Sequence, residues 1–127
     1  MVVIYPAVIH DDDDGLWSEF PDLVGCQSQG DSIEEILANS AEALGCFALG
    51  LLENGKKLPV PSSPTRIATE DGSFVTLIKA DVDLAKNTRS VKKTLTIPAW
   101  LNERAVASGV NFSSVLQDAL LAHLGIL

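Results

Sequence analysis

The C-terminal segment from Val91 to Leu124 combines one short strand pattern with two short helix patterns, and this most constrains how the chain can fold. The strand pattern is VKKTLTI, in which threonines alternate with apolar residues until Pro98 ends it. Roughly 40 residues of strand, helix and helix bury too little apolar surface to stay folded alone. A single strand also leaves its backbone groups unpaired. Antiparallel pairing of two copies about a two-fold axis solves both problems, so we predict a homodimer.

Turn and cap signals place two helices after this strand. Pro98 suits the first turn of a helix over residues 99–108. Gly109 suits the position just after that helix, and Asn111 suits the N-cap of a second helix over residues 112–124. The spacing therefore predicts two helices joined by a tight turn.

Charge is distributed unevenly along the chain. Its 127 residues carry nine basic and seventeen acidic side chains. Residues 1–85 hold four basic and fifteen acidic side chains, a net charge of −11, whereas residues 86–127 hold five basic and two acidic ones, a net charge of +3. Opposite signs indicate two parts with different partners.

The first 82 residues have the pattern of a β-β-β-α-β unit of the α+β class. The strands are expected over residues 2–9, 16–20, 25–29 and 73–82. The run Asp11 to Asp14 ends at Gly15, which is a turn signal between the first two strands. Pro6 falls inside the first strand pattern and suits an edge strand or a bulge. The first three strands are therefore expected to form a meander.

A long helix is expected between the third and fourth strands. Asp31 opens it, and Glu34, three residues later, completes a capping box. Gly45 and Gly50 are expected to permit close contact between helix and sheet. The apolar run over residues 43–52 is too short to span a bilayer, which takes about 20 residues, so we expect a core helix. Its sheet-facing stripe is predicted to be Ile33, Ile36, Leu37, Leu44, Phe47, Ala48 and Leu51.

Several single side chains carry their own expectations. Cys26 and Cys46 have no paired spacing and lie in apolar contexts, so we predict two buried thiols in a reducing cytoplasm. The N-terminus shows no basic region or cleavage site of a secretory signal. His10 has no other His or Cys near it in sequence and is expected on the surface. His123 is expected to pack on the inner side of the last helix, and Trp100 is expected to pack in the dimer.

The aspartate run Asp11 to Asp14 raises the question of a metal-dependent nuclease. Two-metal catalysis needs carboxylates from separate elements that converge on ions about 4 Å apart. The first strand pattern has no internal acid, and the returning strand offers only Asp81 near its end. We therefore interpret the run as a solvated turn and predict no enzymatic activity, no cofactor and no metal.

The strand, Pro98, Gly109 and Asn111 occur in an order that resembles the ribbon-helix-helix family of DNA-binding proteins. The resemblance implies that two paired strands enter the DNA major groove. Alternation would then turn Leu95 and Ile97 into the dimer core and the intervening side chains toward base edges. A ribbon that only dimerises, with a solvated lysine face, is the alternative. The DNA-binding residues implied are Lys92, Thr94, Thr96, Lys93, Arg89, Asn111 and Ser113.

The N-terminal unit resembles the HicB antitoxin family over about 60 residues. The motifs that carry the resemblance are Tyr5-Pro6-Ala7, the Asp-rich tip, Phe20-Pro21-Asp22-Leu23, Gly30-Asp31-Ser32, Asn39 with Ala41, and Glu53-Asn54-Gly55. The resemblance implies a partial RNase H-like fold. It also implies a HicA-like partner toxin, a small basic ribonuclease that the N-terminal domain covers. The C-terminal domain would then bind the operator DNA of the shared operon.

We therefore predict a cytoplasmic two-domain antitoxin and autorepressor, with a toxin-binding domain over 1–82, a linker over 83–90 and a ribbon-helix-helix domain over 91–127. Trp17 is the better candidate for an exposed anchor, whereas Phe20 suits the core equally well. Whether N-terminal domains join dimers into tetramers stays open. The alternative function is a stand-alone ribbon-helix-helix transcriptional regulator without a toxin partner. The toxin-binding residues expected are Asp12, Asp14, Trp17 and Glu19.

Overall fold

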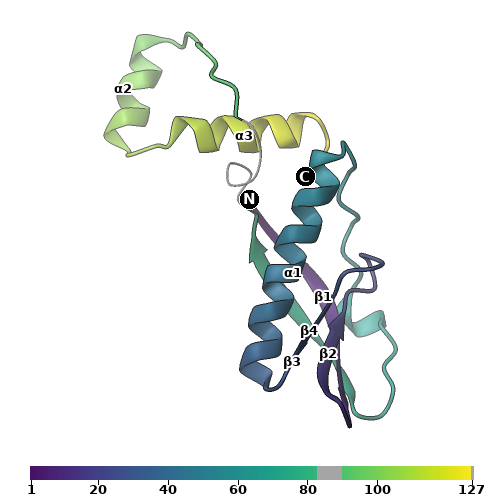
Figure 1. The fold of residues 1–127 in the computed structure, drawn as a ribbon. Helices are drawn as coiled ribbons and strands as arrows, with labels where there is room; N and C mark the ends of the chain where they lie inside the picture. The colour runs from purple at the N-terminus through teal and green to yellow at the C-terminus, as the bar shows by residue number, and fades with distance from the viewer. Residues whose placement is uncertain (83–89, 127) are drawn as a thin grey trace.

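The computed structural model describes residues 1–82 and 90–126, which form a sheet with one long helix followed by a pair of shorter helices (Figure 1). Its elements are β1 (Val2–Asp12), β2 (Gly15–Glu19), β3 (Gln27–Gly30), α1 (Ile33–Glu53), η1 (Pro64–Arg66), β4 (Ser73–Asp81), α2 (Ala99–Ala107) and α3 (Phe112–His123). The predicted α+β class and the β-β-β-α-β order are confirmed. Most of the predicted linker, residues 83–89, lies outside the described residues.

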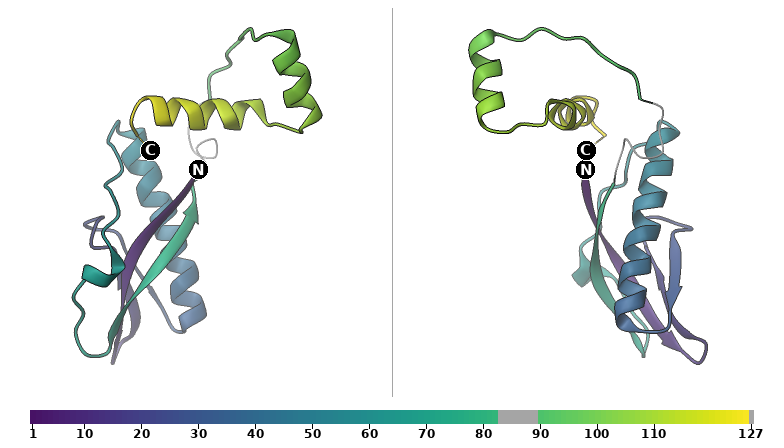
Figure 2. Two further views of the ribbon diagram at one scale, coloured as in Figure 1. Left: turned by 180° about the vertical axis from the view of Figure 1, so that it is seen from behind. Right: turned by 60° about the vertical axis from the view of Figure 1, so that its left-hand side comes forward.

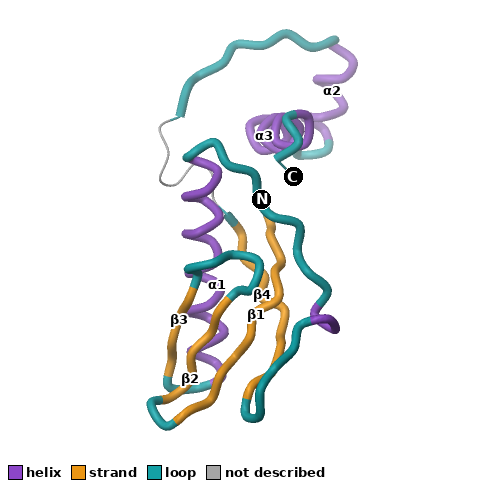
Figure 3. Tube along the Cα trace, turned by 90° about the vertical axis from the view of Figure 1, so that its right-hand side faces the viewer, coloured by secondary structure: helices purple, strands orange, loops and turns teal. Residues whose placement is uncertain are grey.

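The four strands lie in the order β3-β2-β1-β4, and every neighbouring pair is antiparallel (Figure 3). β1 pairs with β4 from Val2 to His10, but with β2 only from Val8 onward. The expected edge position of Pro6 is confirmed locally, because only β4 pairs with β1 there, whereas β1 has a neighbour on each side from Val8 onward. Proline is tolerated because the β2 side of β1 is still unpaired at Pro6, where a missing N–H removes no ladder bond.

α1 packs along one face of the sheet, and the core forms between them (Figure 2). The predicted stripe holds at its centre, since Ile36, Leu44 and Ala48 are fully buried. It is wrong at the start of the helix, where the side chains of Ile33 and Leu37 are 50% and 37% exposed. α1 is long and apolar enough to cross a membrane by length and composition alone. Because its buried face lies on the sheet, it is the core helix of this unit.

The α1 capping box lies one residue later than predicted. Ser32 is the N-cap, and its side chain accepts a hydrogen bond from the Glu35 N–H at 3.1 Å. The Glu35 carboxylate in turn accepts a bond from the Asp31 N–H at 3.3 Å. Asp31 and Ser32 are both N-cap residue types with an acid three positions later, so the local pattern fits either register.

Close approach of α1 to the sheet occurs at Gly30. A Cβ on Gly30 would lie 2.8 Å from the backbone nitrogen of Ile36. A Cβ on Gly45 would make ordinary contact with Ala80 at 3.9 Å, and one on Gly50 would meet nothing within 4 Å. The prediction that Gly45 and Gly50 permit close packing is therefore wrong, and this role belongs to Gly30.

In the C-terminal unit the caps are confirmed but the strand is not. Gly109 follows α2 with a φ of +68°, and the Asn111 side chain accepts a hydrogen bond from the Ser114 N–H at 3.1 Å. Residues 91–97 form no strand, because the described part of this single chain offers them no ladder partner. Ten large apolar side chains of this unit are exposed: Val91, Leu95, Ile97, Trp100, Leu101, Val106, Phe112, Val115, Leu120 and Leu124.

Two predictions on single side chains are wrong, and the predicted packing of Trp100 in a dimer stays a prediction. Cys26 is buried as predicted, but Cys46 lies on the outer side of α1 and is exposed. His123 is exposed on α3 and does not pack inward. Trp100 is 60% exposed in the single chain, with the Arg104 guanidinium 5.8 Å from its ring centroid. Phe20 is 2% exposed, so the core interpretation of Phe20 is confirmed.

Candidate partner-binding surfaces

The hairpin between β1 and β2 presents the aspartate run, and one of its members holds the turn together. The Asp12 carboxylate accepts hydrogen bonds from the Asp14 N–H and from the Trp17 indole N–H, each at 3.0 Å. Asp11, Asp13 and Asp14 are exposed. Asp12 therefore has a structural role in the hairpin, whereas its three neighbours project carboxylates that can meet a basic partner.

Trp17 lies on the sheet face turned away from α1. The register pairs it with His10, and their rings stack with centroids 4.0 Å apart and planes 20° from parallel. Stacking on one side and the Asp12 bond on the other hold the indole in one orientation. A half-buried aromatic held in this way is a rigid anchor for a protein partner.

His10 is part of this cluster, so the expectation of a surface histidine is wrong. Its side chain is only 20% exposed, and its Nδ1 lies 2.7 Å from the Ser73 hydroxyl of β4. Its Nε2 lies 3.4 Å from a Glu19 carboxylate oxygen, without the geometry of a hydrogen bond. Glu19, whose side chain is 41% exposed, thereby joins Trp17 on the same face.

The structure therefore brings together the four residues expected to bind a toxin. Asp12, Asp14 and Trp17 are joined by hydrogen bonds, and Glu19 is reached through His10. Sequence reasoning missed His10 because its position depends on pairing with Trp17 across the hairpin. The alternation of β1, which turns Ile9 toward α1 and His10 away from it, was the available signal. We call Asp11, Asp13, Asp14, Trp17 and Glu19 the acidic hairpin surface.

The side of this surface toward β3 is polar and open. A shallow hollow beside Trp17 is lined by Gln27, Ser28 and Gln29. The Asn39 side chain of α1 donates a hydrogen bond to the Gln29 carbonyl at 2.8 Å, which satisfies one acceptor of this edge strand. Within residues 1–82 and 90–126, no group of three or more His, Cys, Asp or Glu side chains is arranged to hold a metal ion.

The residues expected to bind DNA lie apart from this surface. Lys92, Lys93, Thr94 and Thr96 are exposed on the extended segment before α2. Arg89 lies outside the described residues. At the start of α3, Asn111 satisfies the Ser114 N–H, while Ser113 is exposed in the first turn. First-turn N–H groups at a helix N-terminus form a site suited to a phosphate.

Fold and surfaces together define a binding protein of the α+β class, and comparison with known proteins identifies its family. A family model described as a HicB-like antitoxin of bacterial toxin–antitoxin systems matches residues 5–123. The chain is 32% identical over 105 residues to an uncharacterised 14.9 kDa protein from the rep-hol intergenic region of Haemophilus phage HP1 (strain HP1c1). That match covers 80% of this chain and 78% of the phage protein.

Solved structures agree with the family match. A chain of a toxin–antitoxin complex from Streptococcus pneumoniae is 33% identical, with a TM-score of 0.63, over 97% of this chain and 99% of that one. A chain of the HicA3 and HicB3 toxin–antitoxin complex is 28% identical, with a TM-score of 0.53, over 62% of this chain and 99% of that one. The chain belongs to the HicB-like antitoxin family of bacterial toxin–antitoxin systems.

Proposed function

We propose that this antitoxin neutralises a small, basic, mRNA-cleaving HicA-like toxin by occlusion, and that it represses its own operon by binding operator DNA. The observation that carries the proposal is the family match over residues 5–123, which includes both the acidic unit and the basic segment. Two similar solved chains come from toxin–antitoxin complexes, one of them with HicA3. The mechanism is one of binding alone, without turnover.

The acidic hairpin surface is the part of the chain best suited to a basic toxin. Its free carboxylates at Asp11, Asp13 and Asp14 lie beside the fixed indole of Trp17. A surface of this charge accelerates encounter with a basic protein and competes with RNA for the same cationic site. The aromatic anchor then supplies apolar contact area, which sets how slowly the complex dissociates.

A variant that removes two carboxylates of the hairpin tests the toxin proposal. The side chains of Asp13 and Asp14 can be changed because the hydrogen bonds that hold the turn use the Asp12 carboxylate. The proposed HicA-like toxin is titrated into the purified antitoxin by calorimetry. Combined Asp13→Asn and Asp14→Asn should weaken binding about tenfold or more at low salt, and the loss should shrink as salt screens the charges. Glu42→Gln combined with Glu53→Gln, which removes two exposed carboxylates of α1 outside the acidic hairpin surface, is the control. Equal toxin affinity of the wild type and both variants would show that the toxin binds outside the acidic hairpin surface.

The C-terminal unit is proposed to dimerise and read DNA. Its ten exposed large apolar side chains have no cover within the described chain, and two copies can bury them against each other. Pairing of residues 91–97 would give each strand the ladder partner that it lacks alone. Lys92, Thr94 and Thr96 would then face base edges in the major groove, while Lys93, Arg89 and the α3 N-terminus at Asn111 and Ser113 meet phosphates.

A gel-shift series with the operon's own promoter fragment tests this part. Lys92→Ala and Thr94→Ala should each lower operator affinity and leave the dimer intact by light scattering. Wild-type affinity should also fall steeply between 50 and 200 mM salt, because phosphate contacts release counterions. Unchanged operator affinity in both variants would show that Lys92 and Thr94 do not contact bases in the major groove.

A further inference from the structure

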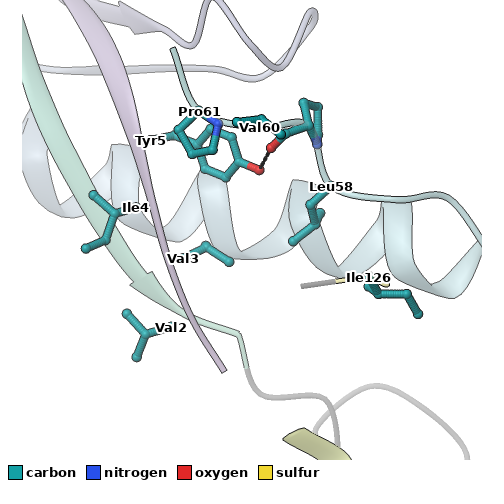
Figure 4. Close-up of a pocket in the computed structure, with 9 residues that line it drawn as sticks. Val2, Val3, Ile4, Tyr5, Leu58, Val60, Pro61 and Ile126 are labelled. Atoms are coloured by element: carbon teal, nitrogen blue, oxygen red, sulfur yellow. Dashed lines mark hydrogen bonds between the residues drawn. The ribbon is translucent and has the colours of Figure 1, made fainter. Parts of the chain in front are cut away.

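An apolar groove of about 260 Å³ opens at the end of the sheet opposite the acidic hairpin (Figure 4). One wall is the start of β1, from Val2 to Tyr5, and the other wall is the segment from Leu58 to Pro61. The remaining lining residue comes from the far end of the chain, Ile126. No second residue of the C-terminal unit lines the groove among the residues that the structure describes.

Hydrogen bonds to side chains hold the second wall in place. The Tyr5 hydroxyl donates a hydrogen bond to the Pro59 carbonyl. Further along, the Asp22 carboxylate accepts hydrogen bonds from the Ser62 N–H at 2.9 Å and from the Ser62 hydroxyl at 2.5 Å. The groove is therefore a formed feature of the N-terminal unit, and it exposes apolar side chains such as Val2 and Ile4, which are 51% and 47% exposed.

The end of α3 is built to turn Ile126 out of the helix. Gly125 adopts a φ of +70°, and its N–H bonds to the Ala122 carbonyl at 3.1 Å. The Ile126 N–H bonds to the Leu121 carbonyl at 2.9 Å, which completes a Schellman motif. A Cβ on Gly125 would lie 3.6 Å from the Lys57 ammonium, so the C-terminal end of α3 also meets a cation of the N-terminal unit. Positive charge there is favourable because helix C-termini carry partial negative charge.

We propose that Gly125 and Ile126 form a latch that docks the helical C-terminal unit on the groove of the sheet unit. The occupant of the groove is the chain's own Ile126, which is partly buried there while the neighbouring Leu124 is 63% exposed. Neither α2 nor α3 packs extensively on the sheet elsewhere in the described chain. The latch therefore sets the orientation of the two units, and with it the position of the DNA-reading segment relative to the acidic hairpin surface.

Nuclear magnetic resonance of the full chain, free of toxin and DNA, tests the latch. In the wild type, backbone amides of α3 and of β1 should report one shared rotational correlation time. Ile126→Ser should abolish this sharing and shift the methyl resonances of Leu58, which lines the groove together with Ile126, because an apolar side chain is lost there. Leu58→Ala, at the half-buried residue of the opposite groove wall, should produce the same loss from the other side.

The controls separate a latch from a general loss of structure. Ile126→Val keeps an apolar side chain of similar shape and should retain the shared correlation time. Val24→Ser changes an apolar residue that is 91% exposed and does not line the groove, so the shared correlation time and the methyl resonances of the groove should stay as in the wild type. Unchanged methyl resonances and tumbling in Ile126→Ser would overturn the latch. Because the measurement uses neither toxin nor operator, its failure is distinguishable from failure of the proposed function.

Discussion

At the residue scale, one buried pair of hydroxyl groups joins α1 to the sheet. Ser18 of β2 and Ser40 of α1 are both 0% exposed, and their Oγ atoms lie 2.7 Å apart. Each hydroxyl satisfies the other in an otherwise apolar core. Ser40 occupies the centre of the buried stripe of α1, where an apolar side chain is the usual choice.

We predict that Ser40→Ala lowers the free energy of unfolding by about 1–3 kcal/mol, because it leaves the Ser18 hydroxyl buried without a partner. The double variant Ser18→Ala with Ser40→Ala should cost less than the two single changes added together. Urea unfolding of the four proteins measures this coupling. Strictly additive losses would show that the two hydroxyls do not depend on each other.

The two thiols are predicted to differ sharply in reactivity. Burial, and secondarily the nearby Cys46, raises the pKa of the Cys26 thiol to about 11. At pH 8 roughly one Cys26 in a thousand is then a thiolate, which is the reactive form. Cys46 is exposed. Ellman's reagent should modify one thiol per chain rapidly, and Cys46→Ser should abolish the fast phase; a fast phase that survives in this variant would contradict the assignment.

Side-chain positions were predictable only where the local pattern decides them. The centre of the α1 stripe follows from apolar spacing, whereas for Phe20 the sequence left the core and an exposed anchor equally open. The positions of three other side chains could not be predicted from local spacing, because their surroundings depend on which strand or which helix face lies opposite. These residues are His10, Cys46 and His123. The His10 side chain is only 20% exposed, and it contacts Trp17 and Ser73, which come from two other strands.

At the element scale, α1 packs closely against β3 through Gly30. The nearest atoms to a built Cβ are backbone atoms of Glu35 and Ile36, which cannot rotate aside. Any larger residue there would push the first turn of α1 away from the sheet. This contact also places the capping box of Ser32 and Glu35 against the end of β3.

We predict that Gly30→Ala costs about 1–3 kcal/mol of stability through this overlap. Gly50→Ala is the matched control, since a Cβ there meets nothing within 4 Å. Removing a glycine from the interior of α1 should raise stability by about 0.5–1 kcal/mol. Thermal unfolding of both variants checks that stability falls in Gly30→Ala and rises in Gly50→Ala. Undiminished stability of Gly30→Ala would mean that the first turn of α1 does not lie so close to β3.

Element positions were largely predictable, and their pairing was not. Alternation located β4 to within one residue, and cap signals located α2 and α3, because these patterns are local. Pro6 correctly indicated the unpaired edge at the start of β1, but the central place of β1 from Val8 onward is a property of the whole sheet and has no local signal. The segment 91–97 has a strand pattern, but a strand needs a partner, and residues 1–82 and 90–126 of one chain do not supply it.

At the scale of the whole molecule, β1 connects the two proposed binding regions. Its eleven residues place the latch groove at one end and the acidic hairpin at the other, roughly 35 Å apart at about 3.3 Å per residue. A toxin on the hairpin would therefore leave residues 91–97, the segment proposed to bind DNA, uncovered. Antitoxin preloaded with toxin should still shift the promoter fragment, with the toxin present in the shifted band. Release of the toxin by DNA would contradict this arrangement.

Antitoxin action itself is tested most directly by inhibition of RNA cleavage. The proposed partner, a small basic HicA-like toxin, is incubated with mRNA while the purified antitoxin is titrated in. We expect cleavage to stop near one antitoxin chain per toxin, and the variant carrying Asp13→Asn and Asp14→Asn to require a clear excess. Undiminished cleavage at a large excess of the wild-type chain would contradict neutralisation by occlusion.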